Sequence, residues 1–372
     1  MNSALLPFGE VDIQALSGLF ESTTNSYKLV FFQAIVNLLQ SRPQATGSLL
    51  LETQDLAVEM AALAWYPHVF YRLSFGSQDH MGKVLDKLRF SVDERAIVHA
   101  DTQKRLRRAI REQYCQIGLQ DLLRYVPYRL LTPFFLERLR GTRDHQVNQL
   151  VRQWSAEAYA TETPVLYRFV EISSPAIELH PSWVAYLKQS LPIVIGWVRK
   201  HWIDYLQLRN PNTPSIPSKV NPPLTRAPLT MQTAYWRAII CKTPLRCLYS
   251  KENLDPRKFA LDHFIPWSFV CHDQIWNLIP VSPKSNSAKR NRLPSKSYLE
   301  RFIELQSEGL SISRTIFDDK RWRKLTEPFV SDLRIASEEL LDAKSLRAAY
   351  NGVLPAMMSL AERTGFSAGW KN

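Results

Sequence analysis

The sequence predicts an α+β fold in which predominantly α-helical regions surround a small unit of two strands and one helix. Apolar residues recur at three-to-four spacing through most of the chain, which is typical of helices with one buried face. Residues 258–266 alternate like a strand instead, and a second β-prone run follows at 275–281. A helix-starting pattern comes directly after that run. We therefore expect a compact ββα unit within a largely helical protein.

The composition is that of a folded, basic protein. Of the 372 residues, 45% are hydrophobic and 22% are charged, and 47 Lys and Arg against 35 Asp and Glu give a net charge of +12. This sign favours polyanionic partners, with nucleic acid first and an anionic membrane surface second. Charge alone does not distinguish between them.

The sequence predicts a cytoplasmic protein with no membrane span. The longest apolar run, 29–39, is too short to cross a bilayer and is interrupted by Gln33 and Asn37. The first residues lack the basic-then-apolar layout of a signal peptide. Four cysteines make no dense disulfide framework, so we expect free thiols in a reducing compartment.

Residues 1–208 are predicted to form a helical N-terminal domain with a targeting or regulatory role. In 26–40, Leu29, Phe32 and Leu39 follow helical spacing and give the helix a broad apolar face. Similar spacing predicts four further helices, over 55–66, 103–125, 146–159 and 183–207.

A proline-rich segment, 209–230, is the clearest predicted domain boundary. It holds six of the 23 prolines, a density that we expect to forbid helix and leave an extended connector. The ββα unit falls in the block that follows, 231–297. Helical spacing returns in 298–372, which we expect to be a helical C-terminal region.

The polar residues of the ββα unit fall at its joints. Asp262 and His263 would face opposite sides of a regular strand, so both serve one site only if the strand ends or twists there, as Pro266 indicates. Ser282 can cap the following helix and Pro283 suits its first turn. Asn286 would then lie about one turn into that helix.

These residue types suit metal-assisted hydrolysis of a phosphodiester. Asp262 and Asn286 offer hard oxygen ligands, which favour Mg²⁺ or Mn²⁺ over zinc. His263 can accept a proton from water near neutral pH. A phosphate bound to the metal and a water activated by histidine make a complete hydrolytic site.

The stretch "LDHFIPWSFVCHDQIWNLIPVSPKSNSAKRNRLPS" resembles the HNH (ββα-metal) endonucleases. It is most similar to the branch with a D-H…N…N pattern found in the HNH domain of CRISPR effector nucleases. The resemblance implies that Asp262 and Asn286 bind metal and that His263 is the general base. It also implies that Asn277 braces the loop between the strands and that Lys289 lies on the helix near phosphate.

Two further features of this region carry expectations. Many HNH proteins hold a structural zinc with two Cys-x-x-Cys pairs, but Cys241 and Cys247 have five residues between them and no second pair follows the motif, so we predict no structural zinc. His272 and Asp273 lie between the strands and are predicted to be solvated loop residues rather than ligands.

A cluster of basic residues follows the second strand and contains no acid. The cluster consists of Lys284, Lys289, Arg290, Arg292 and Lys296. We expect these side chains to be exposed and to contact DNA phosphates. The run at 104–111 fits either the solvated face of an amphipathic helix or a second nucleic-acid contact. The aromatic residues of 64–75 are expected in a core.

The sequence thus predicts a metal-dependent endonuclease that cuts DNA, and the resemblance implies a role in bacterial restriction or anti-phage defence. One alternative is a mobile-element nuclease, although no zinc-finger or helix-turn-helix pattern is present. Another is a nuclease subunit that docks onto other protein subunits of a recognition complex. A third is a non-catalytic nucleic-acid-binding subunit, which would have no reason to keep Asp262, His263 and Asn286 together.

Overall fold

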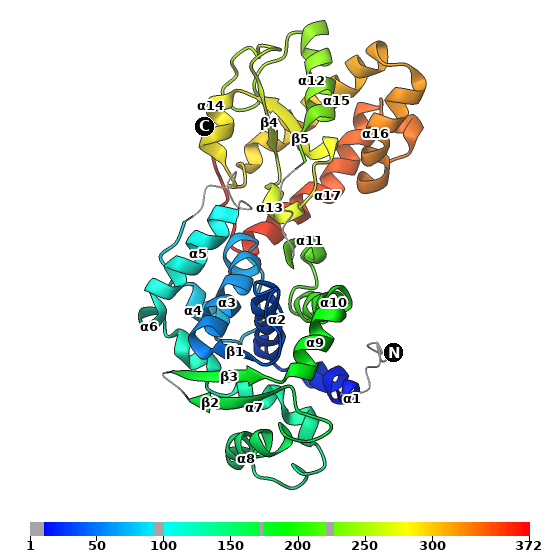
Figure 1. Ribbon diagram of the computed structural model, residues 1–372. Helices are drawn as coiled ribbons and strands as arrows, with labels where there is room; N and C mark the ends of the chain where they lie inside the picture. The colour runs from blue at the N-terminus through cyan, green and yellow to red at the C-terminus, as the bar shows by residue number, and fades with distance from the viewer. Residues whose placement is uncertain (1–10, 92–99, 172–173, 221–226) are drawn as a thin grey trace. The chain divides into compact units, whose positions relative to one another are not determined.

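The computed structural model describes residues 11–91, 100–171, 174–220 and 227–372. It divides the chain into two compact units, each with its own core (Figure 1). Unit 1 comprises Met1–Pro211 and Ile216–Thr225, and unit 2 comprises Asn212–Ser215 and Arg226–Asn372. Both are mostly helical with one small sheet each, so the predicted α+β fold class is confirmed.

Two buried helices form the centre of unit 1. Helix α2 (Tyr27–Gln40) packs against α3 (Thr53–Trp65), as Figure 1 shows. Both helices bury apolar residues on more than one face, because further helices cover α2 on its other sides. The helix predicted over 26–40 is present and starts one residue later, at Tyr27. It is buried on several sides, whereas the sequence predicted one broad apolar face.

Two of the long helices expected from spacing are interrupted. The stretch 103–125 divides into several short elements, and the chain leaves the helical conformation at Gly118, whose φ of 75° suits glycine. The stretch 183–207 becomes two helices separated at Ser190, because Pro192 has no N–H to continue the ladder and belongs in a first turn. The helices are α5 (Ala100–Glu112), α6 (Tyr114–Ile117), η3 (Leu119–Leu123), α9 (Pro181–Gln189) and α10 (Leu191–Arg209).

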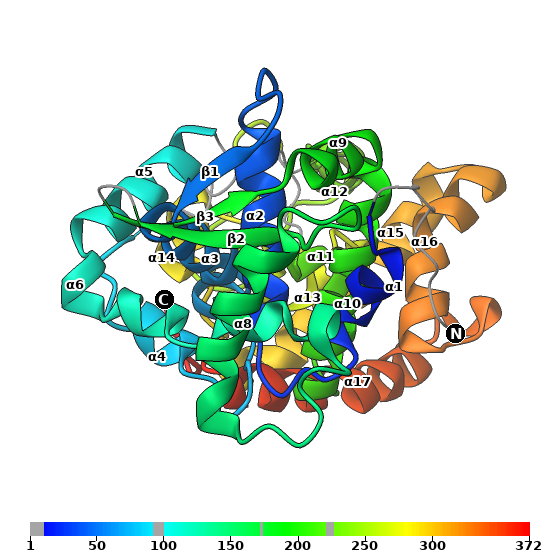
Figure 2. The same cartoon turned by 60° about the horizontal axis from the view of Figure 1, so that its bottom comes forward.

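Unit 1 also contains a three-stranded antiparallel sheet that the spacing did not reveal. Strand β3 (Pro175–Leu179) lies between β1 (Leu49–Glu52) and β2 (Tyr167–Glu171), with Ile177 opposite Leu51 and Phe169 (Figure 2). The remaining helical elements of unit 1 include α1 (Ile13–Ser17), η1 (Gly18–Phe20), η2 (Tyr66–Phe70), α4 (Met81–Leu85), α7 (Val126–Leu130), η4 (Thr132–Phe135) and α8 (Asp144–Ala158).

The proline-rich segment is not wholly extended. Residues 216–220 form a short helix, α11 (Ile216–Val220), which packs against α10 and buries Ile216. Pro217 is tolerated because it stands in the first turn, where its missing N–H would have no helical partner. The expectation that this segment excludes helix is therefore wrong for these residues, and 221–226 lie outside the described ones.

Unit 2 is built around a strand pair, β4 (Ala260–His263) and β5 (Leu278–Val281). One hydrophobic core joins the pair to the helices before and after it, with Phe264 stacked 4.1 Å from Phe302 and the Tyr350 hydroxyl donating to the Trp276 carbonyl at 2.8 Å. The helical elements are α12 (Thr230–Lys242), α13 (Trp267–Val270), η5 (Ile275–Asn277), α14 (Pro283–Lys289), η6 (Lys296–Tyr298), α15 (Leu299–Ile316), α16 (Asp319–Leu333), η7 (Ser337–Glu339) and α17 (Ala343–Arg363).

The last residues of the chain pair with the segment after α14. The amide of Leu293 donates to the Ser367 carbonyl at 2.8 Å, and the amide of Trp370 donates back to Leu293 at 3.0 Å. Trp370 then packs edge-on against Tyr249, with ring centroids 4.9 Å apart. Residues 298–372 are therefore integral to the core that carries the ββα unit.

Within the part of the chain that the structure describes, none of the helices combines the length and apolar character needed to span a bilayer.

Candidate active site

The two strands and α14 form the predicted ββα unit. The antiparallel register places Asp262 opposite Ile279 and His263 opposite Leu278, and β4 ends at His263. The Ser282 hydroxyl accepts a hydrogen bond from the Ser285 amide at 3.2 Å. Pro283 occupies the first turn of α14. The cap and helix start inferred from the sequence are thus present, and α14 lies beside β4 (Figure 1).

Asp262 lies at the centre of a buried polar cluster. Lys289 donates to Asp262 Oδ1 at 3.0 Å, and the Tyr249 hydroxyl donates to Asp262 Oδ2 at 2.7 Å. Burial and the Asp262 charge raise the pKa of the Tyr249 phenol well above its ordinary value, so that the phenol stays protonated and remains a donor. Each carboxylate oxygen therefore has one donor and keeps a further lone pair.

Lys289 is not a surface residue. Its side chain is 0% exposed, and its ammonium binds both the Asp262 carboxylate and the His263 carbonyl, the latter at 2.7 Å. The expectation of an exposed Lys289 in contact with DNA phosphate is therefore wrong. The reason is helical geometry: Ser282, Ser285 and Lys289 follow three-to-four spacing and share the inward face of α14.

Asn286 lies one turn before Lys289 on α14, at the spacing that places two side chains on neighbouring parts of one helix face. It is partly buried. Lys289 reaches Asp262 from this helix, and Asn286 precedes Lys289 by one turn. The amide oxygen of Asn286 and the remaining lone pairs of Asp262 are hard donors, which fit a divalent ion completed by water and phosphate oxygens. Within the described ranges, no group of three or more His, Cys, Asp and Glu is placed to hold a metal ion.

His263 pairs with a carboxylate that the sequence interpretation set aside. Its Nε2 lies 2.8 Å from Asp273 Oδ1, and the two side chains are only 11% and 22% exposed. The expectation that Asp273 is a solvated loop residue is wrong. Its neighbour His272 is also engaged, because His272 Nδ1 accepts from the Gln274 amide at 3.3 Å and the ring lies against Trp276.

Asn277 ties the two ends of the loop together. Its Oδ1 accepts from the Ile265 amide at 2.8 Å and its Nδ2 donates to the Ile265 carbonyl at 2.9 Å. The Phe264 amide donates to the Asn277 carbonyl at 2.9 Å. Because Asn277 is fully buried, it acts on the loop that follows His263 and does not reach the solvent side of the site.

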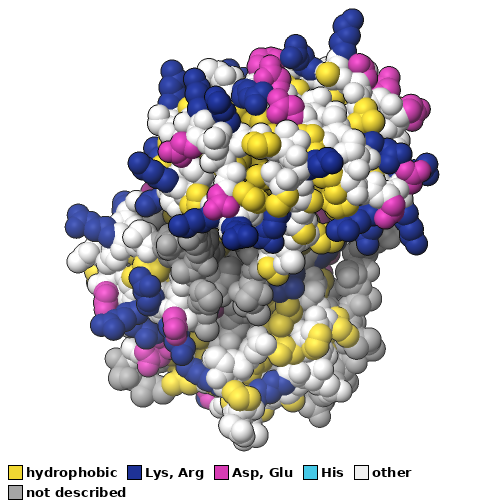
Figure 3. All heavy atoms as spheres, turned by 90° about the horizontal axis from the view of Figure 1, so that it is seen from above, with side chains coloured by type: hydrophobic (Ala, Val, Ile, Leu, Met, Phe, Trp, Pro, Cys, Tyr) yellow, Lys and Arg dark blue, Asp and Glu magenta, His cyan; other side chains and the backbone are white. Residues whose placement is uncertain are grey.

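The basic cluster does not lie on one helix. Helix α14 ends at Lys289, and Arg290 follows with φ 53° and ψ −131°. The Arg292 guanidinium donates to the carbonyls of Ala288 and Lys289 at the end of α14 and lies over the Trp370 ring. The exposed members are therefore Lys284, Arg290, Arg292 and Lys296. On the face of unit 2 seen in Figure 3, Lys and Arg side chains are spread among Asp and Glu.

The two cysteines near the strand pair have different surroundings. Cys241 is exposed, whereas Cys247 is buried and its Sγ accepts from the amides of Ser250 at 3.5 Å and Ser282 at 3.3 Å. Burial by itself would raise the pKa of the Cys247 thiol, but these hydrogen bonds lower it below the ordinary value. Cys247 therefore helps to fix the residue that caps α14.

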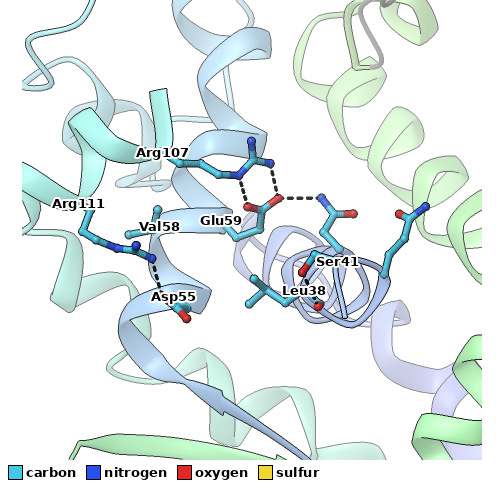
Figure 4. Close-up of a pocket in the computed structure, with 9 residues that line it drawn as sticks. Leu38, Ser41, Asp55, Val58, Glu59, Arg107 and Arg111 are labelled. Atoms are coloured by element: carbon cyan, nitrogen blue, oxygen red, sulfur yellow. Dashed lines mark hydrogen bonds and ion pairs between the residues drawn. The ribbon is translucent and has the colours of Figure 1, made fainter. Parts of the chain in front are cut away.

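A pocket of about 490 Å³ lies in unit 1, remote in sequence from the ββα unit (Figure 4). Arg107 forms two hydrogen bonds with the buried Glu59, at 2.6 and 2.8 Å, and Arg111 binds Asp55 at 2.5 Å. Two arginines of the basic run at 104–111 are thus paired with carboxylates inside unit 1. This favours a structural role for that side of α5 over a nucleic-acid contact.

Comparison with known proteins places the ββα unit in a family. Residues 247–295 match the family described as HNH endonuclease. No curated protein and no solved structure gives a significant match to the chain. The matched segment contains Asp262, His263, Asn277 and Asn286, together with the strand pair and α14. The closer similarity to the CRISPR branch stays a prediction. The segment 247–295 is therefore an HNH-type unit, similar to nucleases that generally use a divalent metal ion.

Proposed function

We propose that the protein is an endonuclease that hydrolyses DNA with Mg²⁺ or Mn²⁺. The observation that supports this proposal is the position of Asp262 and His263 at the end of β4, beside α14, whose Lys289 binds both residues. Asp262 and Asn286 would hold the ion. When bound there, a divalent ion supplies charge stabilisation at the scissile phosphate and at the leaving 3′ oxygen.

His263 is the proposed general base. It is the titratable group next to the proposed ligand Asp262, and imidazole is able to take a proton from water near neutral pH. Lys289 acts differently from the phosphate contact expected from sequence: its ammonium fixes the Asp262 carboxylate and the His263 carbonyl together, so ligand and base keep one relative position. Asn277 fixes the backbone two residues beyond the base.

The exposed basic residues beside the site would bind the DNA backbone. Over 226–300 the sequence holds twelve Lys and Arg against five Asp and Glu, which accounts for seven of the net positive charges. Contacts to phosphate carry affinity without sequence information. We further propose, from the resemblance alone, a cytoplasmic role in restriction or anti-phage defence, in which unit 1 would contribute targeting or docking onto other subunits.

The test is cleavage by the purified full chain. Supercoiled plasmid and a single-stranded circle are incubated with Mg²⁺, Mn²⁺ or EDTA, for the wild type, His263→Ala and His272→Ala. We expect metal-dependent cutting by the wild type and a rate about 10²–10⁴-fold lower for His263→Ala. His272→Ala, a histidine of the neighbouring loop, should cut nearly as fast as the wild type.

Two results would contradict the proposal. Equal rates for His263→Ala and the wild type would remove His263 as the base. Tight DNA binding by the wild type with no cutting of either substrate under any metal would favour a nucleic-acid-binding subunit instead.

A further inference from the structure

We propose that Asp273 is a positioning residue for His263, which holds the imidazole ring with its proton on Nε2 and so makes Nδ1 the proton-accepting atom. This inference rests on the proposed nuclease function and deepens it, because it identifies the atom of His263 that would take the proton from water. Neither the family match nor the D-H…N…N pattern assigns a role to Asp273.

The tautomer follows from the chemistry of the pair. His263 Nε2 and Asp273 Oδ1 are 2.8 Å apart, which is a hydrogen-bonding distance. An ionised carboxylate can only accept hydrogen bonds, so the proton of this bond belongs to Nε2. In a neutral imidazole the other ring nitrogen then carries the lone pair, and the hydrogen bond of one nitrogen sets the role of the other.

Both partners are fixed by other contacts. The Asp273 carbonyl accepts from the Gln232 side chain of α12 at 3.0 Å, which anchors the loop to a helix. The His263 carbonyl accepts from Lys289 at 2.7 Å, and His263 is paired with Leu278 in the sheet. A base whose backbone and ring are both held needs little reorganisation when it accepts a proton.

The loop also has anchors that do not involve the Asp273 carboxylate. The far end of the loop has a separate carboxylate anchor, because Trp276 Nε1 donates to Asp332 Oδ2 at 2.6 Å. Asn277 ties Ile265 to the start of β5 independently of Asp273. Because these anchors remain when Asp273 is replaced by Asn, we expect the substitution to alter the histidine more than the fold.

The first experiment compares two isosteric substitutions, Asp273→Asn and Asp332→Asn. An asparagine amide at 273 can donate to Nε2, which favours the opposite tautomer. We expect Asp273→Asn to lower the single-turnover cleavage rate at saturating DNA by about 10²-fold, with unchanged DNA affinity and melting temperature. Asp332→Asn keeps an acceptor for Trp276 and should cleave at nearly the wild-type rate. In a His263→Ala background, Asp273→Asn should cause no further loss, because Asp273 acts through the histidine.

The second experiment reads the ring directly and needs no cleavage. In metal-free protein labelled with ¹⁵N-histidine, long-range ¹H–¹⁵N spectra distinguish the Nε2–H tautomer from the Nδ1–H tautomer. We expect His263 in the wild type and in Asp332→Asn to be the Nε2–H form, and Asp273→Asn to shift it toward the Nδ1–H form. The His263→Ala spectrum assigns the signal.

The two experiments separate the inference from the proposed function. A wild-type His263 in the Nδ1–H form, or a ring spectrum that Asp273→Asn leaves unchanged, would overturn the positioning role even if the protein cuts DNA. Equal losses of rate in Asp273→Asn and Asp332→Asn would also overturn it, because they would indicate a general loss of loop structure. Absence of cutting by the wild type, with the expected ring spectra, would contradict the nuclease and support the pairing.

Discussion

The ammonium of Lys289 lies 3.0 Å from the carboxylate of Asp262 where both side chains are nearly inaccessible to solvent, at 0% and 4% exposure. A buried pair of this kind is sensitive to the loss of one member, because the remaining charge keeps its desolvation penalty without its partner. Substitutions at either residue therefore change stability as well as chemistry, and the design of inactive variants has to account for both.

Lys289→Met should strongly destabilise unit 2. The substitution leaves the Asp262 carboxylate buried with Tyr249 as its remaining described partner, which we expect to lower the free energy of unfolding by about 3–5 kcal/mol. Chemical denaturation measures this change. Lys284→Met is the matched control, since Lys284 is exposed on the same helix and its loss should stay within about 0.5 kcal/mol. Similar small effects for both variants would mean that the Lys289–Asp262 pair contributes little.

Removing a proposed metal ligand should abolish Mn²⁺ binding without unfolding the protein. Asn286→Ala is the cleaner test, because Asn286 is only partly buried whereas Asp262→Ala would leave Lys289 uncompensated. In calorimetry, we expect Asn286→Ala to show none of the heat of Mn²⁺ binding that the wild type gives. The variant should also cut DNA about 10³-fold more slowly, which corresponds to an activation free energy higher by about 4 kcal/mol. EDTA should stop wild-type cutting, and added Mg²⁺ or Mn²⁺ should restore it.

The control for this prediction is Ser287→Ala, an exposed neighbour on α14. It should bind Mn²⁺ and cut like the wild type. Calorimetric binding by Asn286→Ala equal to that of the wild type would remove Asn286 from the ligand set.

Arg290 should show opposite effects on stability and on DNA binding. Its φ of 53° with ψ −131° favours glycine, so Arg290→Gly should raise the free energy of unfolding by about 1 kcal/mol. The exposed guanidinium follows the proposed metal helix directly, and its loss should weaken binding of unrelated duplexes and lower the salt slope by about one unit. Fluorescence binding at several salt concentrations measures the slope.

Lys251→Gly provides the comparison for Arg290. Lys251 is also exposed, basic and at positive φ (61°), but it lies before β4 and away from the end of α14 in sequence. The Lys251→Gly variant should gain a similar free energy of unfolding, and the salt dependence of its DNA binding should equal that of the wild type. Identical slopes for wild type and Arg290→Gly would show that Arg290 does not contact phosphate.

Cys247→Ala should destabilise the start of α14. The substitution removes the sulfur that accepts from the Ser250 and Ser282 amides, and we expect a loss of about 1–3 kcal/mol. Cys241→Ala, at an exposed position, should change stability by less than about 0.5 kcal/mol. Denaturation of both variants under reducing conditions gives the comparison, and equal midpoints would rule out this role for the thiol.

Local patterns predicted the ββα unit because its signals act over a few residues. The alternation around Asp262, the stop at Pro266 and the cap at Ser282 each depend on neighbours in sequence. The separation of α9 from α10 at Ser190 could also have been predicted locally, because Pro192 favours the first turn of a new helix. The helix-rich fold class followed from repeated three-to-four spacing.

Long-range relations were beyond such patterns. Strand β3 pairs with β1, which precedes it by more than a hundred residues, and strands of four or five residues carry little periodicity. Asp273 was interpreted as solvated because only the folded loop brings it to His263. Lys289 was grouped with basic neighbours, although its spacing from Ser282 and Ser285 marks the inward face of α14.

The pairing of Leu293 with Ser367 and Trp370 has a consequence for the order of assembly during translation. Unit 1 is synthesised first and can fold while the ribosome is still working, as domains generally do. The strand pair and α14, by contrast, share their core with α17, and Tyr249 next to Asp262 packs against Trp370. The proposed site therefore stays incomplete on the nascent chain until residues 343–370 have emerged, so that unit 1 can fold well before this site does.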